Sequence, residues 1–183
     1  MYERFGVFAG ALDEVVGGFG GVVGGGLREV MWGDGERLVL TGWAQPALFG
    51  VQVGLVRLLE SWGVRADVVV GHSVGEVAAA FVAGVLSLGD ACRLVAVRAG
   101  LMQGLSVGGV MVAIGASEER VRGALVAGAE VAAVNGPDAV VVSGVADAVA
   151  RVAAGFERVR PLRVSHAFHS GLMEPMLAEF GAA

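Results

Sequence analysis

Apolar residues recur every three or four positions over three stretches of the chain, which is the spacing of an amphipathic helix. These stretches predict helices over residues 2–16, 47–62 and 89–105. The apolar face of the middle one consists of Leu48, Val51, Leu55, Leu58 and Trp62. Thr41–Pro46 is predicted as a loop before it, because proline fits the first position of a helix.

The second half of the chain has shorter elements, in which the spacing of apolar residues changes between that of a strand, every second residue, and that of a helix. Strands are predicted at 110–114, 131–134, 139–143 and 159–164, with helices at 117–126 and 146–156 between them and a last helix at 174–180. The order βαββαβ is that of the ferredoxin-like unit. We therefore predict an α/β protein in which this small subdomain is inserted into a larger one.

A short apolar run, Val68-Val69-Val70, stops at the sequence Gly71-His72-Ser73-Val74-Gly75. A strand, a sharp turn with serine between two glycines, and a helix form the G-x-S-x-G nucleophile elbow. The free N–H groups of the helix that begins at Val74 would face the oxygen that Ser73 attacks. The alternative is an ordinary turn in which the serine only caps the helix.

Arg98 falls within the apolar face of the helix predicted at 89–105, four residues after Leu94 and four before Met102. An arginine on an inward face needs an anion, because an unpaired buried charge is very costly. The residues alone leave three readings open: an ion pair with Glu76, a side chain that reaches the surface, or a carboxylate-binding group near the serine.

A serine nucleophile needs a base, and the chain has three histidines. His72 is adjacent to the serine and points elsewhere around a sharp turn, so we expect it to pack under the elbow. His166 and His169 flank the return from the small subdomain and are better candidates. Asp138 and Asp147 stand where a third triad member could, but each suits a turn or helix start, which favours a serine–histidine dyad.

Composition narrows the class of protein. The chain has 183 residues, a net charge of -5 and 55% hydrophobic residues, which fits one compact domain without a nucleic-acid surface. The lone Cys92 excludes a disulfide framework and fits a reducing cytoplasm. The uncharged stretches 38–56 and 99–117 are interrupted by polar residues and glycine pairs, so we expect no membrane span.

Four motifs together resemble the acyltransferase domain of modular polyketide synthases, in the malonyl-CoA:acyl-carrier-protein transacylase superfamily. They lie in the same order along essentially the whole chain: Thr41-Gly42-Trp43-Ala44-Gln45-Pro46, Gly71-His72-Ser73-Val74-Gly75-Glu76, Ala133-Val134-Asn135-Gly136-Pro137 and Val164-Ser165-His166-Ala167-Phe168-His169-Ser170. The resemblance implies an α/β-hydrolase-like large subdomain with an inserted ferredoxin-like one. It implies subdomain limits of 1–109 for the large part, 110–165 for the small one and 166–183 for the return.

The resemblance also assigns roles to residues. Ser73 would be the acylated nucleophile, His169 the base, and Arg98 the group that binds the free carboxylate of the extender unit. The N–H of Val74 would be one oxyanion donor, and Gln45 would contact substrate.

His166 and Phe168 would line the acyl pocket, as part of a signature similar to the malonyl-specific type. A phenylalanine there would crowd a 2-methyl group, which discriminates by about 1–3 kcal/mol. Trp43 departs from the tyrosine that the family more often has.

The resemblance implies malonyl-CoA as substrate, no bound cofactor or metal, and a phosphopantetheine-bearing acyl carrier protein as partner, beside ketosynthase and linker segments of a synthase. The family's opening strand and Gly-Gln-Gly-x-Gln loop would precede Tyr2, and the segment that closes the large subdomain would follow Ala183. We therefore expect a truncated domain. A catalytically inactive fragment and a serine hydrolase or thioesterase are the alternatives.

Overall fold

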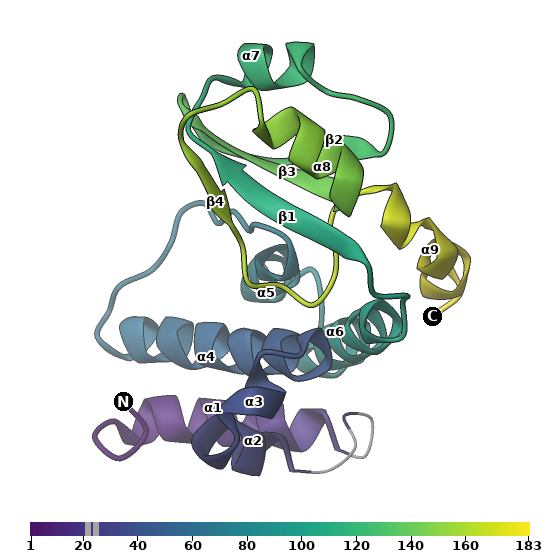
Figure 1. Cartoon of the computed structure of the whole chain (residues 1–183). Coiled ribbons are helices and arrows are strands. Elements are labelled where there is room, and N and C mark those ends of the chain that lie inside the picture. The colour runs from purple at the N-terminus through teal and green to yellow at the C-terminus, as the bar shows by residue number, and fades with distance from the viewer. Residues whose placement is uncertain (21–22, 24–25) are drawn as a thin grey trace. The chain divides into compact units, whose positions relative to one another are not determined.

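The structure is a computed structural model that describes residues 1–20, 23 and 26–183. It divides into two compact units, the first comprising residues 1–101 with Ala183 and the second residues 102–182 (Figure 1). The predicted subdomain limits 1–109, 110–165 and 166–183 stay a prediction.

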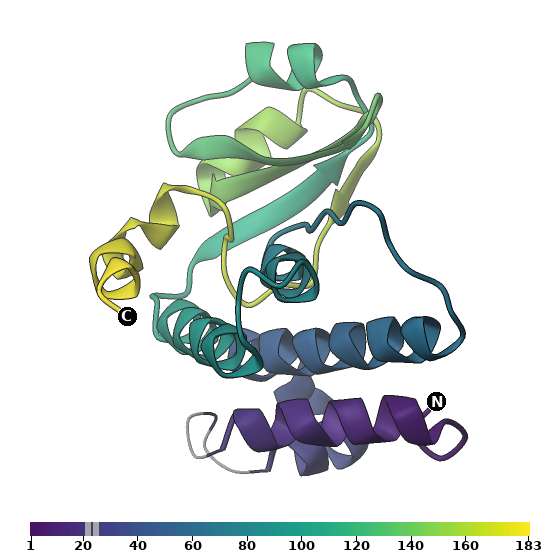
Figure 2. The ribbon, with the colours of Figure 1, turned by 180° about the vertical axis from the view of Figure 1, so that it is seen from behind.

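The first unit consists of helices in its described part. These are α1 (Gly6–Gly18), α2 (Leu27–Gly33), α3 (Gly35–Leu38), α4 (Thr41–Ser61), α5 (Val74–Val82) and α6 (Leu88–Gln103). Helix α4 packs between α1 and α5, as both views show (Figures 1 and 2). The core of the first unit is built around the fully buried Phe49, whose ring packs edge to face against Phe19 and Phe81.

The buried face of α4 differs from the predicted one. Leu48, Leu55 and Trp62 are exposed, whereas Gly50 and Gly54 are buried. A Cβ at Gly50 would lie 2.7 Å from Leu12 Cδ1, and one at Gly54 would lie 2.8 Å from Phe8 Cε2. The two glycines therefore let α1 approach closely, and this contact decides which face turns inward.

Helix α4 also begins earlier than predicted, because the N–H groups of Trp43 and Ala44 bond to the Leu40 carbonyl at 2.9 and 2.8 Å. Thr41–Pro46 is thus helical and not a loop, with Pro46 inside the helix.

The predicted strand at Val68–Val70 does not form. These residues are irregular, and Val68 and Val70 are 86% and 94% exposed. A strand needs a neighbour that completes its hydrogen-bond ladder, and no described strand pairs with this segment. The β-branched residues of this segment favour a strand, but without a pairing partner they do not form one.

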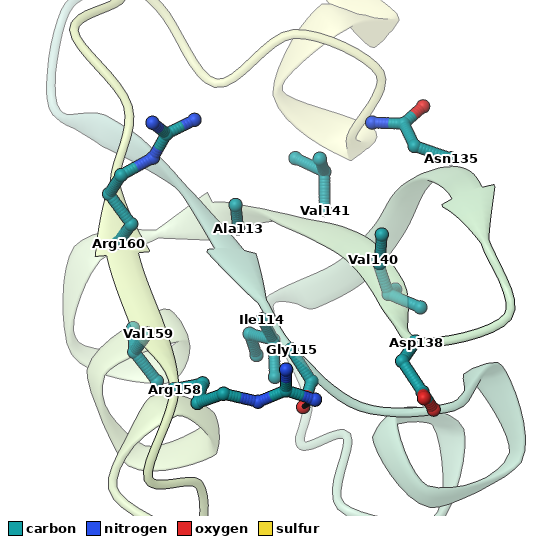
Figure 3. A pocket seen from close by; sticks show the side chains of 11 residues that line it. Ala113, Ile114, Gly115, Asn135, Asp138, Val140, Val141, Arg158, Val159 and Arg160 are labelled. Atoms are coloured by element: carbon teal, nitrogen blue, oxygen red, sulfur yellow. Dashed lines mark hydrogen bonds between the residues drawn. The ribbon is translucent and has the colours of Figure 1, made fainter.

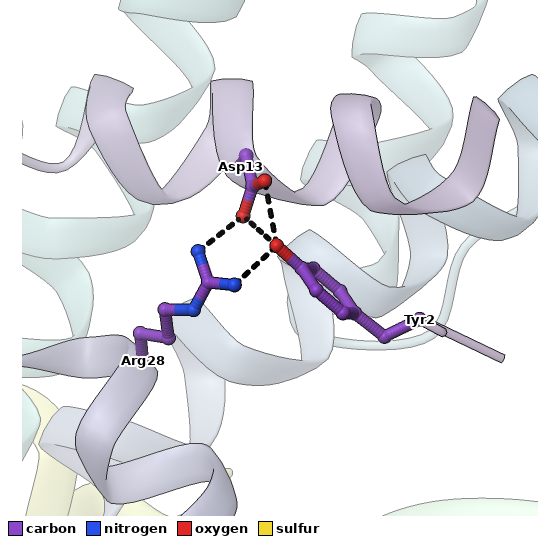
Figure 4. Close-up of polar contacts among 3 residues, drawn as sticks. All are labelled: Tyr2, Asp13 and Arg28. Carbon is purple, nitrogen blue, oxygen red and sulfur yellow. Dashed lines mark hydrogen bonds and ion pairs between the residues drawn. The ribbon is translucent and has the colours of Figure 1, made fainter. Parts of the chain in front are cut away.

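The start of the chain is fixed by a cluster of Tyr2, Asp13 and Arg28 (Figure 4). The Tyr2 hydroxyl donates to both Asp13 oxygens at 2.8 and 2.7 Å, and Arg28 Nη1 lies 2.9 Å from Asp13 Oδ1. Arg28 Nη2 also donates to the Tyr2 oxygen. Tyr2 therefore folds back onto α1 from a turn, and the helix begins at Gly6, not at residue 2.

The second unit confirms the ferredoxin-like order. It consists of β1 (Gly109–Ile114), α7 (Glu118–Gly123), β2 (Ala129–Gly136), β3 (Ala139–Val145), α8 (Ala146–Ala153) and β4 (Val159–Pro161), followed by the 3-10 turn η1 (Gly171–Met173) and α9 (Glu174–Gly181). The strands are antiparallel in the order β2-β3-β1-β4. Strand β4 ends sooner than predicted at Pro161, which has no N–H for the ladder.

Helices α7 and α8 cover one face of the sheet. Val121 of α7 and Val149 and Val152 of α8 pack against Val140 and Val142 of β3, all nearly or fully buried. Strand residues alternate between the two faces, so this core follows from the valine spacing of β3. None of the described helices is long and apolar enough to cross a membrane.

Candidate active site at the Ser73 elbow

Ser73 stands in a backbone conformation that serine rarely adopts. Its φ is 56° and its ψ is -120°, directly before the first residue of α5. Such a conformation persists only where the surroundings enforce it, and it is typical of functional sites. The side chain is thus presented at a helix N-terminus, as the G-x-S-x-G pattern predicted.

The two glycines of the motif are not equivalent. A Cβ at Gly71 would lie 2.2 Å from both Glu76 N and Gly75 O, so only glycine fits there. A Cβ at Gly75 would meet only Gln52 Nε2 at 3.5 Å, an ordinary contact. The tight turn therefore depends on Gly71.

Arg98 of α6 lies beside Ser73. Its Nη2 donates to Ser73 Oγ at 2.9 Å, and its Nη1 donates to Gln45 Oε1. Gln45, on α4, is buried. Three residues predicted at the site, from three helices or their ends, thus form one contiguous polar group within the first unit.

The charge of Arg98 has no counterion in the part of the chain that the structure describes. No carboxylate oxygen of the described residues lies within 4.0 Å of its guanidinium, which rules out the ion pair with Glu76. The side chain is half-buried, and this desolvation lowers its pKa. A cation in such a place favours binding of an anion.

The backbone offers one further group at the elbow. Val74 is the first residue of α5, so its N–H lies outside the intrahelical ladder. The neighbouring N–H groups of Gly75 and Glu76 are taken by the carbonyls of His72 and Ser73, both at 3.0 Å. Among the described residues, the N–H of Val74 has no backbone acceptor, and its predicted role as an oxyanion donor stays a prediction.

His166 belongs to the second unit, where it is buried and holds two chain segments together. Its Nε2 lies 2.9 Å from the Leu105 carbonyl oxygen, which only accepts, so this nitrogen carries the proton. Its Nδ1 lies 3.0 Å from Ser165 Oγ. These two contacts give His166 a structural role in the second unit. Its assignment to the acyl pocket stays a prediction.

His169 and Phe168 lie in the same return segment of the second unit. His169 is exposed and has a φ of 58°, the second non-glycine residue with a positive value in the described chain. It precedes Ser170, whose Oγ donates to the Ala167 carbonyl at 2.7 Å. The Phe168 ring centroid lies 5.9 Å from that of His166. Their predicted roles are likewise not tested by this geometry.

Two cavities lie outside the polar group of Ser73, Arg98 and Gln45. In the first unit, a cavity of about 290 Å³ beside the elbow is lined by His72, Val70 and Gln52, whose buried Oε1 has no partner among the described residues. His72 is exposed, so the expectation that it packs under the elbow is wrong.

In the second unit, a cavity of about 330 Å³ lies against strands β1, β3 and β4 (Figure 3). Arg158, Arg160, Asn135 and Asp138 are its polar lining residues, and Arg158 Nη2 donates to the Gly115 carbonyl at 2.9 Å. No serine, cysteine or histidine lines it.

One contact was missed by the sequence reasoning. Gln45 Nε2 donates to Thr41 Oγ1 at 2.7 Å, and both side chains are buried. The two residues are four apart, the spacing of neighbours on a helix. The prediction that residues 41–46 form a loop concealed this spacing.

Ser73, in a rarely adopted backbone conformation at a helix N-terminus, thus lies beside an arginine that has no carboxylate partner among the described residues. The chain belongs to the acyl transferase domain family, whose family model matches residues 2–182. This confirms the resemblance and the class of enzyme, an acyltransferase.

Individual relatives and solved structures agree with this family assignment. The chain is 57% identical over 199 residues to the polyketide synthase GfsA of Streptomyces halstedii, covering 99% of this chain. It is similar to the crystal structure of the acyltransferase domain from the second module of the salinomycin polyketide synthase, with a TM-score of 0.91 and 55% identity over 98% of this chain. An acyl carrier protein S-malonyltransferase of Vibrio cholerae matches 98% of this chain, with a TM-score of 0.83 and 32% identity.

These matches confirm the predicted α/β fold class. They also show that the chain spans only part of the length of these relatives: 3% of GfsA, 43% of the salinomycin domain and 62% of the Vibrio cholerae enzyme.

Proposed function

We propose that the chain takes part in malonyl transfer from malonyl-CoA to an acyl carrier protein, through an acyl-enzyme formed on Ser73. The single observation that carries this is the guanidinium of Arg98, 2.9 Å from Ser73 Oγ and without a carboxylate partner among the described residues. A free carboxylate on the acyl group would supply the missing anion.

The reaction proceeds in two half-reactions. His169 takes the Ser73 hydroxyl proton while Oγ attacks the thioester carbonyl, and the resulting oxyanion accepts a hydrogen bond from the N–H of Val74. The carbon–sulfur bond then breaks, and the CoA thiol leaves with the proton from His169. In the second half, the phosphopantetheine thiol gives its proton to His169 and its sulfur attacks the malonyl ester carbonyl; the bond to Ser73 Oγ then breaks, and Oγ takes the proton back from His169.

Arg98 contributes positioning and selection. A malonyl carboxylate accepts charge-assisted hydrogen bonds from a guanidinium, in a geometry that the two atoms Nη1 and Nη2 favour. The Ser73 and Gln45 oxygens that now accept from these atoms mark where the carboxylate would approach. An acetyl group offers no such acceptor. This contrast supports an acyltransferase over a general serine hydrolase.

Selection among extender units would fall to Phe168 and His166, which we assign to the acyl pocket. A phenylalanine leaves less room for a 2-methyl branch than a smaller residue does, so malonyl is preferred over methylmalonyl by about 1–3 kcal/mol. The natural partners are a carrier protein and neighbouring polyketide synthase segments, in the cytoplasm. The scheme needs no bound cofactor.

The experiment is intact-protein mass spectrometry of the protein that carries this chain, after incubation with malonyl-CoA. A malonyl-sized adduct is expected in the unaltered protein and not in Ser73→Ala. Addition of a phosphopantetheinylated carrier protein should remove the adduct and place the same mass on the carrier. The same adduct on Ser73→Ala, or a folded protein without any adduct, would contradict the proposal.

A further inference from the structure

Thr41 is the buried end of a chain of hydrogen-bonded polar side chains that begins at the half-buried Ser73. Ser73 Oγ accepts from Arg98 Nη2, and Arg98 Nη1 donates to Gln45 Oε1. Gln45 Nε2 in turn donates to Thr41 Oγ1 at 2.7 Å. Thr41 and Gln45 are each 6% exposed, so water does not compete freely for these atoms.

The direction of these bonds is set by the chemistry of the groups. A guanidinium has donors only, so the amide of Gln45 must turn its oxygen toward Arg98. Its NH₂ group then faces the opposite way and needs an acceptor. The Thr41 hydroxyl supplies that acceptor, one helical turn earlier on α4.

We infer that Thr41 is a positioning residue for selection of the acyl group, acting through Gln45 to hold the Arg98 guanidinium at Ser73. The inference rests on the proposed function, in which that guanidinium binds the acyl carboxylate. Thr41 itself does not contact the nucleophile or the acyl group in this role. It fixes the amide orientation on which the Arg98 position depends.

Loss of the hydroxyl should therefore affect one class of substrate. Without the acceptor that Thr41 supplies, the amide of Gln45 is less strongly held, and the guanidinium loses a fixed support. Malonyl transfer depends on that guanidinium, whereas acetyl transfer does not. A defect confined to packing would slow both substrates alike.

The matched variants are Thr41→Val, which keeps the shape and removes the hydroxyl, and Thr41→Ser, which keeps the hydroxyl. We would measure rates of acyl-enzyme formation from malonyl-CoA and acetyl-CoA in the protein that carries this chain. Thr41→Val should lower the malonyl-to-acetyl rate ratio by about 5- to 20-fold, the effect of losing one buried hydrogen bond. Thr41→Ser should keep the ratio of the unaltered protein.

The ratio is internal to each sample, so partial unfolding of a variant does not change it. If Thr41→Val does not fold, Thr41→Ala is used in the same comparison. An unchanged ratio in the hydroxyl-free variant, or an equal loss for both substrates, overturns the inference. Absence of any malonyl-enzyme in the unaltered protein would instead count against the proposed function.

Discussion

Replacing Gly71 by alanine should disable the elbow, whereas the same change at Gly75 should not. The added Cβ at Gly71 would lie 2.2 Å from Glu76 N, 2.2 Å from Gly75 O and 2.3 Å from Glu76 Cα. Ordinary contacts of a Cβ begin at 3.4 Å. The backbone must therefore move by about 1 Å, because all three atoms belong to the main chain and none can rotate away.

The displaced atoms are those that place the nucleophile and the helix N-terminus. A misplacement of about 1 Å at a reacting group costs on the order of 100-fold in rate. Gly71→Ala should therefore slow malonyl-enzyme formation by about 100-fold or more. Gly75→Ala should slow it far less, since its Cβ would meet only Gln52 Nε2, at 3.5 Å.

The assay is rapid acid quenching followed by intact-protein mass, with each variant shown to be folded by circular dichroism. The quantity to compare is the rate of malonyl-enzyme formation in Gly71→Ala relative to that in Gly75→Ala. If Gly71→Ala forms the adduct within about tenfold of Gly75→Ala, the steric account of the elbow is wrong.

Three further predictions concern stability. Ser87 Oγ accepts from Asp90 N at 3.1 Å as the cap of α6, so Ser87→Ala should lower the free energy of unfolding by about 1 kcal/mol in urea titrations; no change would refute the cap. Gly144 has a φ of 150° and its Cβ would lie 2.1 Å from Gly128 O, so Gly144→Ala should cost more than about 3 kcal/mol by the same measurement. Burial raises the pKa of the Cys92 thiol to about 11, so between pH 9 and 11 the unfolded chain loses this proton while the folded chain keeps it. The free energy of unfolding should therefore fall more steeply over that range in the unaltered protein than in Cys92→Ala, and parallel curves would contradict it.

The sheet unit could be predicted from the sequence because its elements are local and mutually consistent. The valine-rich run of β3 alternates between two faces, and Asn135-Gly136-Pro137 marks the turn before it. Helix α6 was predictable in the same way, because its apolar spacing is local and Ser87 and Asp90 bond to each other at its start. Arg98 on its apolar face was predicted to need an anion; the structure places its guanidinium 2.9 Å from Ser73 Oγ, and the anion itself stays a prediction.

Features that depend on distant partners could not be predicted. Val68–Val70 has the residue types of a strand, yet a strand forms only against a neighbour, which residue preference does not supply. The inward face of α4 is chosen by two glycines that admit α1, against the stronger apolar signal of Leu48 and Leu55. Close helix packing thus outweighed periodicity.

The contact of Thr41 with Gln45 was hidden for a related reason. Pro46 favours a helix start, which predicts a loop for the residues before it and gives their four-residue spacing no meaning. In the structure the Leu40 carbonyl accepts the first bonds of the helix, which begins at Thr41, five residues before Pro46.

The central claim is that Arg98 binds the carboxylate of the acyl group that Ser73 receives. The direct measurement is the rate of acyl-enzyme formation by Arg98→Ala with malonyl-CoA and with acetyl-CoA. Loss of one partner of a buried charge pair costs about 2–5 kcal/mol, so the malonyl rate should fall by about 30-fold or more. The acetyl rate should stay near that of the unaltered protein. Equal losses with both substrates, or an unchanged malonyl rate, would contradict the account.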